Sequence, residues 1–330
     1  MFYIDTQTNL QDLTQYLQKK GWLHAAEIIT DTAIPGAGNM NVVVRLTTNQ
    51  RTLILKQSRP FVQKYPQLAA PLNRIDVEYQ FYTAMQAAAQ QLEKSPFPKL
   101  LQYDADEHLM LLEDLGHGKD MSSIYAARHI SEQQTKQLVR FLETIHQVVP
   151  PKGYPINEGL RQLNHQHIFV LPFLADNGFD LDNVQQGLQA LAQAYKQDNA
   201  LTTIATQLGE AYLSAGTTLL HGDYYPGSWM QQQEALCIID PEFSFVGDAY
   251  YDVGVFVAHL IIATGNINKL DWVLDNYSLP IDKKKVQQLA GIEIMRRLIG
   301  LGQLPLEHTL AEKKELLELA KELILSSDSQ

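Results

Sequence analysis

The hydrophobic pattern predicts strands in the first third of the chain and helices in most of the rest. Leu10, Leu13 and Leu17 share one face of a helix expected over residues 8–20. Short apolar and β-branched runs then alternate with turn residues, whereas the proline-rich stretch 59–73 is expected to be a loop. The strands predicted in this part are 42–44, 52–58, 100–103 and 108–112, and the helix among them is 75–85.

From Ser131 onward, apolar residues recur mainly at helical spacing. Ser131 and Gln134 predict a capping box at the start of a helix over 132–147. One hairpin interrupts the helices, because 228–230 and 235–239 read as strands joined by a polar turn. The further helices predicted are 184–195, 200–214, 253–263, 269–276, 284–301 and 310–325. The chain is therefore expected to form an α+β fold with an N-terminal lobe, 1–115, and a mostly helical C-terminal lobe, 116–330.

The expected hairpin can bring together carboxylates that are far apart in sequence. Asp223 follows His221 and Gly222, and Asp240 lies 17 positions later, directly after the second strand. A hairpin returns the chain on itself, so these two side chains can meet. Phosphoryl transfer needs such an arrangement, with one carboxylate at the acceptor hydroxyl and others at a magnesium ion on the phosphates.

A second group of polar residues lies in the N-terminal part. Gly36, Gly38 and Asn39 form a turn before a strand, where backbone N–H groups could approach phosphate, although glycines also serve ordinary hairpin turns. Lys56 lies in the next predicted strand, and Glu78 lies in the helix that follows. A strand lysine followed by a helix glutamate is the ion pair that positions a kinase lysine, although Glu78 could also be a solvated carboxylate.

His-Gly-Asp followed by an Asp after a hairpin resembles the aminoglycoside phosphotransferase and choline kinase group of small-molecule kinases. Two departures from the usual motif are informative: Ser228 stands where most of the group has Asn, and Glu242 follows Asp240 by two residues. Methylthioribose kinases share both features and a late arginine pair, which is similar to Arg296 and Arg297 here. The resemblance implies a protein-kinase-like two-lobed fold and a phosphotransferase that uses ATP and Mg²⁺.

The resemblance also implies roles for individual residues. Asp223 would hold the acceptor hydroxyl in line with the γ-phosphorus, and Asp240, Glu242 and Ser228 would be magnesium ligands. Backbone groups near Glu113 and Leu115 would bind adenine. Asp252 would brace the catalytic loop through backbone hydrogen bonds, and His221 is expected to orient that loop.

Several residues that could bind the acceptor molecule have two interpretations. Arg296 and Arg297 lie inside an apolar helix, so each needs a partner there. They could pair with Glu293 or another acid, or they could bind sugar hydroxyls. Tyr224 could line the acceptor pocket or belong to the core. His165 and His167 are favoured as packing or helix-end residues over metal ligands.

Composition narrows the function classes. The net charge of −11 argues against nucleic acid and anionic membranes as partners. The single cysteine, Cys237, excludes an internal disulfide and lies in an apolar run, so it is expected to be a buried hydrophobic residue in a cytoplasmic protein. No signal peptide or membrane-spanning segment is expected. A homodimer is one candidate assembly.

The favoured function is phosphorylation of a small-molecule hydroxyl, with methylthioribose or a related sugar as the leading acceptor. An aminoglycoside or choline acceptor remains open, since the first would prefer a broad acidic face and the second an aromatic cage. A different class, a nucleotide-binding pseudokinase scaffold, is supported only by Ser228. A protein kinase is disfavoured by Gly222 in place of Arg and by the lack of an evident activation segment after Asp240.

Overall fold

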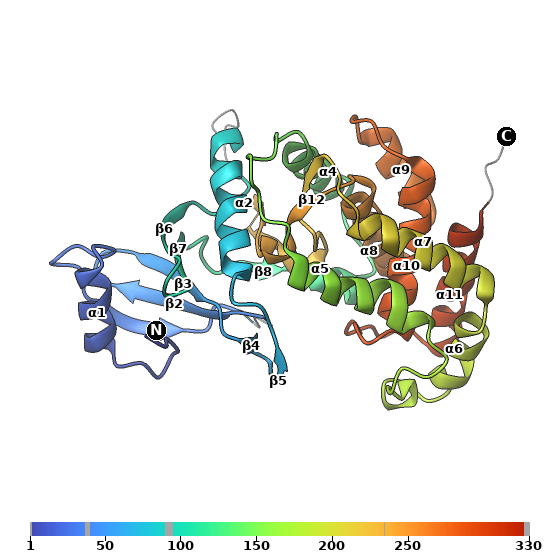
Figure 1. Ribbon diagram of the computed structural model, residues 1–330, viewed down its shortest axis with the longest axis horizontal. Helices are drawn as coiled ribbons and strands as arrows, with labels where there is room; N and C mark the ends of the chain where they lie inside the picture. The colour runs from blue at the N-terminus through green and yellow to red at the C-terminus, as the bar shows by residue number, and fades with distance from the viewer. Residues whose placement is uncertain (1, 37–39, 90–94, 234, 327–330) are drawn as a thin grey trace. The chain divides into compact units, whose positions relative to one another are not determined.

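The computed structural model describes residues 2–36, 40–89, 95–233 and 235–326 (Figure 1). The chain divides into two compact units, each assembled from separate segments of sequence. Unit 1 comprises Met1–Lys119, Gly153–Leu160 and Met230–Ser244, and unit 2 comprises Asp120–Lys152, Arg161–Trp229 and Phe245–Gln330. The lobe boundary predicted between residues 115 and 116 stays a prediction.

Unit 1 is built on a five-stranded antiparallel sheet with the order β1-β2-β3-β7-β6. Side chains alternate between buried and partly buried along β2, because its apolar face packs against the helix α1 (Leu10–Lys19), whose Leu13 and Leu17 belong to the same core. A second helix, α2 (Arg74–Ala89), packs against β6 and β7. The strands are β1 (Ile29–Ala33), β2 (Val42–Thr48), β3 (Thr52–Gln57), β6 (Leu100–Asp104) and β7 (Leu109–Glu113).

The proline-rich stretch 59–73 contains a small hairpin where a loop was predicted. Its strands β4 (Phe61–Val62) and β5 (Tyr65–Ala69) pair in antiparallel fashion, and every residue of β5 is exposed. A strand that is exposed on both faces has no period-two hydrophobic pattern, and an edge position tolerates Pro66. The prediction was therefore wrong because the hairpin carries no burial signal.

The predicted later hairpin is present. Its strands, β10 (Trp229–Gln232) and β11 (Ala235–Ile238), are neighbours in a sheet of order β11-β10-β8, and a short 3₁₀ turn, η6 (Pro241–Phe243), follows. The chain passes between the two units within β8 (Lys119–Asp120), β10 and the helix α5 (Glu158–His165).

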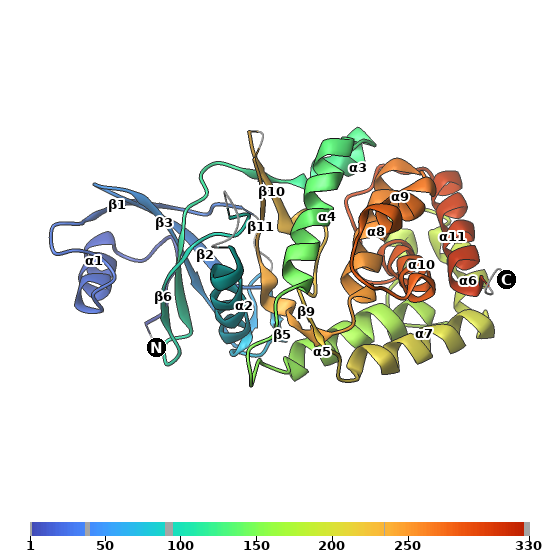
Figure 2. The same ribbon diagram turned by 90° about the horizontal axis from the view of Figure 1, so that it is seen from above.

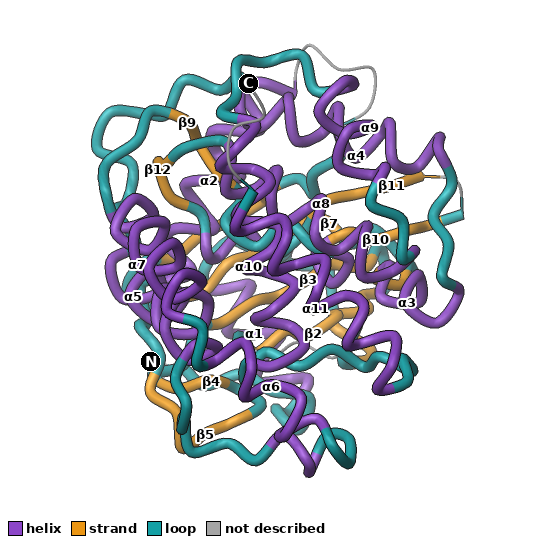
Figure 3. Tube along the Cα trace, turned by 90° about the vertical axis from the view of Figure 1, so that its right-hand side faces the viewer, coloured by secondary structure: helices purple, strands orange, loops and turns teal. Residues whose placement is uncertain are grey.

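Unit 2 is mostly helical, as Figure 3 shows in purple. At its centre α8 (Tyr250–Thr264) packs against α10 (Lys283–Ile299), which also packs against α11 (Leu310–Leu325) (Figure 2). Nearly all of α8 is buried, which explains its continuous apolar sequence. The other helices are α3 (Ile124–Ala127), α4 (Glu132–His146), α6 (Leu188–Lys196), α7 (Asn199–Leu213) and α9 (Asn268–Asn276).

Short elements connect these helices. The strands β9 (Thr218–Leu220) and β12 (Phe245–Gly247) pair in antiparallel fashion just before and after the hairpin segment. The single turns are η1 (Met121–Ser123), the π-helical η2 (Gln166–Val170), η3 (Leu171–Phe173), η4 (Leu181–Asn183) and η5 (Pro226–Ser228). Among the described residues, none of the helices is both long enough and apolar enough to cross a bilayer.

Most predicted helix bounds agree with the structure to within about two residues, but α2 ends later and α8 starts earlier than predicted, and the start of α6 also differs. The capping box of Ser131 and Gln134 is present at α4. The helix expected from residue 184 begins instead at Leu188, because Gly187 adopts a left-handed φ of 88° that a continuous helix cannot contain. The preceding residues form the short turn η4.

Candidate active site

Lys56 of β3 forms the predicted ion pair with Glu78 of α2. The distance between Lys56 Nζ and Glu78 Oε1 is 2.5 Å, and both side chains are buried. Burial raises the pKa of Glu78, and the neighbouring Lys56 opposes that shift. The pair therefore depends on mutual charge compensation.

A second carboxylate binds the same ammonium group. Asp240 Oδ1 lies 2.6 Å from Lys56 Nζ, and the Asp240 side chain is 45% exposed. Its backbone adopts a left-handed φ of 59°, which turns the chain from β11 into η6. Burial lowers the pKa of Lys56, but Asp240, Glu78 and Glu242 together raise it well above its ordinary value. Lys56 is therefore charged at physiological pH.

Glu242 of η6 is a buried carboxyl beside this cluster. Its Oε2 accepts a hydrogen bond of 2.9 Å from Asn41 Nδ2 and lies 3.6 Å from Arg74 Nε. Burial raises the pKa of Glu242 to about 8, against the opposing effect of Lys56. A divalent cation near this group would favour its ionised form. Sequence reasoning named neither Asn41 nor Arg74, since nothing local in the sequence links them to Glu242.

The donor set in unit 1 fits a magnesium ion that is held jointly with phosphate. Asp240 and Glu242 each offer carboxylate oxygens, which Mg²⁺ prefers. No group of three or more His, Cys, Asp or Glu residues that could hold a metal occurs among the described residues. Mg²⁺ in nucleotide sites needs only one or two carboxylates, because phosphates and water complete its coordination. Two carboxylates are thus sufficient for this role.

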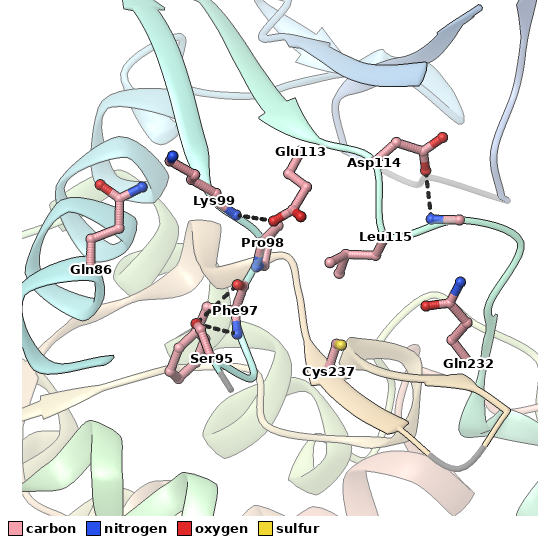
Figure 4. A pocket seen from close by; sticks show the side chains of 11 residues that line it. Gln86, Ser95, Phe97, Pro98, Lys99, Glu113, Asp114, Leu115, Gln232 and Cys237 are labelled. Atoms are coloured by element: carbon pink, nitrogen blue, oxygen red, sulfur yellow. Dashed lines mark hydrogen bonds between the residues drawn. The ribbon is translucent and has the colours of Figure 1, made fainter. Parts of the chain in front are cut away.

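The residues predicted to bind adenine line a pocket of about 700 Å³ in unit 1 (Figure 4). Glu113 and Leu115 both contribute to its wall, together with Gln86, Ser95, Phe97, Pro98, Lys99, Asp114, Gly116, Gln232 and Cys237. The Glu113 carboxylate accepts a hydrogen bond from the Lys99 N–H at 3.2 Å, and the Glu113 N–H donates to the Lys99 carbonyl at 2.9 Å. Among the described residues, the Leu115 N–H has no hydrogen-bond partner, so it is available to a ligand. Cys237 is buried, as predicted.

A partly buried arginine braces the segment that forms this wall. Arg45 of β2 contacts Asp114 through two parallel hydrogen bonds, Nε to Oδ2 at 2.8 Å and Nη2 to Oδ1 at 3.0 Å. Arg45 Nη2 also donates to the Gly116 carbonyl at 2.6 Å. Burial opposes ionisation of Asp114, but the bond to Arg45 keeps its pKa below the ordinary value. The brace fixes the backbone on either side of Leu115.

The glycine-rich turn is described only in part. Gly36 is exposed, and no atom outside its neighbours would contact a Cβ there. Gly38 and Asn39 lie outside the described residues.

The segment of unit 2 that was predicted to be catalytic, which contains His221, Gly222 and Asp223, is held by Asp252 of α8. Asp252 Oδ2 accepts a hydrogen bond from the His221 N–H at 2.7 Å, and Oδ1 accepts one from the Gly222 N–H at 3.0 Å. The predicted brace is therefore present. His221 is buried and its Nδ1 accepts a hydrogen bond from the Asp223 N–H at 3.3 Å, which agrees with an orienting role. Gly222 has a φ of 82°, which allows the turn that presents Asp223.

Arg296 and Arg297 both pair with Glu293, one turn earlier on α10. Arg296 Nη1 lies 3.0 Å from Glu293 Oε2, and Arg297 Nε lies 2.6 Å from Oε1. These arginines keep the pKa of the buried Glu293 well below its ordinary value, although burial acts in the opposite direction. The ion-pair interpretation is confirmed. A contact with the acceptor stays a prediction.

Arg297 also faces the catalytic segment. Its guanidinium carbon lies 4.9 Å from the centre of the Tyr225 ring, two residues after Asp223. Burial lowers the pKa of Arg297, but Glu293 and Asp223 raise it above its ordinary value. His259 contacts the same glutamate, since its Nε2 lies 3.2 Å from Glu293 Oε1, and its Nδ1 lies 2.6 Å from Tyr125 Oη. His259 was missed because it lies in an apolar stretch that reads as a buried helix, and no sequence pattern marks Tyr125 as its partner.

Tyr224 and Ser228 occupy buried positions in unit 2. Tyr224 is fully buried and its hydroxyl donates to the Leu138 carbonyl at 2.7 Å, which favours the core alternative for this residue. Ser228 closes the turn η5, and its N–H donates to the Tyr225 carbonyl at 2.8 Å. Whether Asp223 and Ser228 act with Asp240 on one ion stays a prediction.

The fold is protein-kinase-like, with an antiparallel sheet in the N-terminal part and a helical C-terminal part. It resembles that of LicA, a choline kinase from Streptococcus pneumoniae, in its complex with AMP: the TM-score is 0.54, the identity is 15%, and the match covers 95% of this chain and 97% of that chain. This likeness establishes the protein-kinase-like fold, and the buried lysine–glutamate pair agrees with it.

The chain belongs to the phosphotransferase enzyme family, which its residues 32–269 match. It is 29% identical to a methylthioribose kinase of Exiguobacterium sibiricum, over 69% of this chain and 60% of the relative. It is 24% identical to a methylthioribose kinase of Bacillus mycoides, over 94% of this chain and 91% of the relative. The chain thus spans about three fifths of the first relative and nine tenths of the second.

Proposed function

We propose that this protein is an ATP-dependent kinase that phosphorylates a hydroxyl group of a small sugar-like molecule. The observation that carries the proposal is the placement of Lys56 between Glu78 and Asp240, at 2.5 and 2.6 Å. A buried lysine in this arrangement presents a fixed positive charge for phosphate oxygens. The family membership supports the same reaction type.

The residues of the candidate active site have distinct roles in the proposed reaction. Lys56 binds the nucleotide phosphates, and Glu78 holds Lys56 in position. Asp240 and Glu242 hold Mg²⁺, which supplies charge neutralisation on the phosphates when it is bound, and Ser228 is a further candidate ligand. Asp223 accepts the proton of the acceptor hydroxyl and orients that group for attack. Catalysis then comes mainly from positioning and electrostatic stabilisation.

The adenine base occupies the pocket that Glu113 and Leu115 line. A volume of about 700 Å³ suits a nucleoside. The Leu115 N–H, which has no partner in the part of the chain that the structure describes, is a donor for the base. Gly36, Gly38 and Asn39 belong to the turn that approaches the phosphates. The AMP in the LicA structure supports nucleotide use in this fold.

Methylthioribose is the acceptor that we favour. The curated relatives carry that name, and the charge around Tyr225 points in the same direction. The two arginines there are balanced by Glu293 and Asp223, so the site offers no excess of negative charge to a polycationic aminoglycoside or to the cation of choline. A neutral sugar with several hydroxyl oxygens can accept hydrogen bonds from Arg297.

The test is a comparison of wild-type protein with Asp223→Asn. We expect kcat with methylthioribose to fall by roughly 10²- to 10⁴-fold, because the hydroxyl loses its proton acceptor. The dissociation constant of MgADP should change little, since Asp223 has no role in nucleotide binding. Unchanged turnover in the variant would refute the assignment of Asp223.

The choice of acceptor needs a separate measurement. A panel of methylthioribose, ribose, choline and an aminoglycoside, each with ATP and Mg²⁺, should give turnover with the first and far less with the others. Turnover with none of them, despite normal MgADP binding, would favour the pseudokinase alternative. We further infer a cytoplasmic protein from its single cysteine, and sedimentation analysis would test for a homodimer.

A further inference from the structure

Arg74, the first residue of α2, is fully buried in unit 1. Burying a guanidinium group is costly unless its donors are satisfied. Its Nη atoms donate to backbone carbonyls from three segments of unit 1: those of Met40, Arg59, Phe61 and Pro71, at 2.9, 2.8, 3.4 and 2.6 Å. These bonds alone give Arg74 a structural role in holding the end of the glycine-rich turn and the β4–β5 hairpin.

The remaining donor of Arg74, its Nε, bonds to a side chain instead of a backbone carbonyl. Its Nε donates to Asn41 Oδ1 at 2.8 Å, and the same oxygen accepts a hydrogen bond of 3.0 Å from Ser58 Oγ. Two donors on Oδ1 fix the orientation of the Asn41 amide, because the amide nitrogen must then point the other way. Asn41 Nδ2 donates to Glu242 Oε2 at 2.9 Å.

Glu242 is thereby held through one of its two oxygens. Oε2 accepts from Asn41 and faces Arg74 Nε at 3.6 Å, whereas Oε1 has no hydrogen-bond partner among the described residues. Asn41 is 4% exposed and Glu242 is 8% exposed, so water cannot easily replace the amide. A carboxylate that is fixed through one oxygen presents the other in a defined direction.

We propose that Asn41 is a positioning residue that orients Glu242 toward the divalent cation, with Arg74 and Ser58 fixing the Asn41 amide. The proposal rests on the proposed function, in which Glu242 is a cation ligand. Groups that orient a metal-binding carboxylate typically affect metal affinity by 10- to 100-fold when they are replaced. Because Asn41 directly precedes β2, the same side chain links the end of the glycine-rich turn to the Asp-Pro-Glu segment.

The test replaces only the N–H donor that Asn41 offers to Glu242. Asn41→Asp keeps an acceptor for Arg74 and Ser58 but removes the N–H group that Glu242 accepts from. The probe is ADP, whose dissociation constant is measured by calorimetry with Mg²⁺ and again with EDTA. The metal-dependent gain in ADP affinity is the ratio of the two constants. We expect the gain to fall by about tenfold in Asn41→Asp, while the constant in EDTA stays within a factor of two or so of wild type.

Asn157 provides a matched control. It is a second buried asparagine of unit 1, and its Nδ2 donates to the backbone carbonyls of Glu242 and Ser244 at 2.9 and 3.0 Å. Asn157→Asp disturbs the same segment without touching the Glu242 carboxylate. We expect a lower melting temperature and an unchanged metal-dependent gain. Asn41→Ser, which is too short to reach Glu242, is a milder second variant and should behave like Asn41→Asp.

The outcomes separate the inference from the function it rests on. If Asn41→Asp lowers the melting temperature but leaves the metal-dependent gain unchanged, Asn41 is only structural and the inference fails. A larger gain in Asn41→Asp would mean that the new carboxylate binds the cation itself, which also overturns the inference. If wild-type protein binds ADP equally with Mg²⁺ and with EDTA, the proposed function fails instead.

Discussion

Two buried charge clusters, one in each unit, differ in their balance of acids and cations. In unit 1, Lys56 is surrounded by the carboxylates of Glu78, Asp240 and Glu242, and Arg74 lies beside Glu242. In unit 2, Glu293 lies between Arg296 and Arg297, and Asp223 also acts on Arg297. The first cluster has more acids than cations, whereas the second has equal numbers of both.

The two balances of charge indicate different ligands. The acid-rich cluster in unit 1 holds Glu242 with a pKa of about 8, so a further cation there would relieve an unfavourable arrangement. In the balanced cluster of unit 2 the two arginines keep Glu293 ionised, and burial lowers the pKa of the neighbouring His259 to about 4. Hydrogen-bond acceptors without positive charge are the suitable ligands there.

The largest effect should come from breaking the unit 2 cluster. Glu293→Gln leaves two arginines with reduced charge compensation, and removal of one partner from a buried ion pair typically costs about 3–5 kcal/mol. We expect a loss of that order in the free energy of unfolding, measured by urea denaturation. Glu312→Gln is the control, because Glu312 pairs with Arg128 at the surface, where ion pairs contribute little. Equal losses in the two variants would contradict the account.

A smaller effect should come from the unit 1 cluster. Asp240→Asn removes the partly exposed carboxylate that binds Lys56, and we expect the stabilisation of the protein by MgADP over ADP alone to fall. A tenfold loss of metal-dependent affinity corresponds to about 1.4 kcal/mol. Thermal denaturation with ADP, with and without Mg²⁺, measures it.

Asp114→Asn is the matched control for Asp240→Asn. It weakens the Arg45 brace of the adenine pocket, so it should reduce ADP affinity to the same extent with and without the metal. If Asp114→Asn abolished the magnesium effect and Asp240→Asn did not, the assignment of the metal ligands would be wrong.

An effect of about the same size should be a pH dependence that His259 introduces. Its folded-state pKa of about 4 is below the ordinary 6.5, so below pH 6.5 the unfolded chain takes up a proton that the folded protein does not. Stability should therefore fall as the pH decreases from about 6.5 to about 4. Near pH 5.5 the loss should be about 1.4 kcal/mol.

His259→Gln tests this pH dependence, because glutamine can bond to Tyr125 and Glu293 without titrating. We expect the difference in unfolding free energy between pH 7 and pH 5.5 to shrink in the variant, as measured by urea denaturation at both pH values. Identical pH profiles for the two proteins would show that His259 does not account for the acid sensitivity.

Most of the fold and the Lys56–Glu78 pair could be predicted because they depend on local patterns. The order of a strand lysine followed by a helix glutamate indicates the pair, and the bounds of α11 agree with the predicted 310–325. The bond of each arginine to Glu293 follows from helical spacing, since residues three and four positions apart are neighbours.

The parts that could not be predicted depend on contacts between distant segments. Asn41 reaches Glu242 across 201 positions of sequence, and no local pattern marks either residue as its partner. Tyr125 and His259 are similar, because a polar residue in an apolar helix reveals its partner only in three dimensions. Tyr224 illustrates the remaining difficulty, since an aromatic residue beside a catalytic motif fits a pocket and a core equally well.

The chain moves between the two units after residues 119, 152, 160, 229 and 244. On the ribosome, therefore, unit 1 cannot be completed until residue 244 of 330 has emerged, when roughly three quarters of the protein has been made. Until then, Lys56 and Glu78 lack Asp240, and β8 lacks the β10–β11 hairpin that pairs with it. No single cut of the gene separates one intact unit from the other, so truncated fragments are poor substitutes for the whole chain.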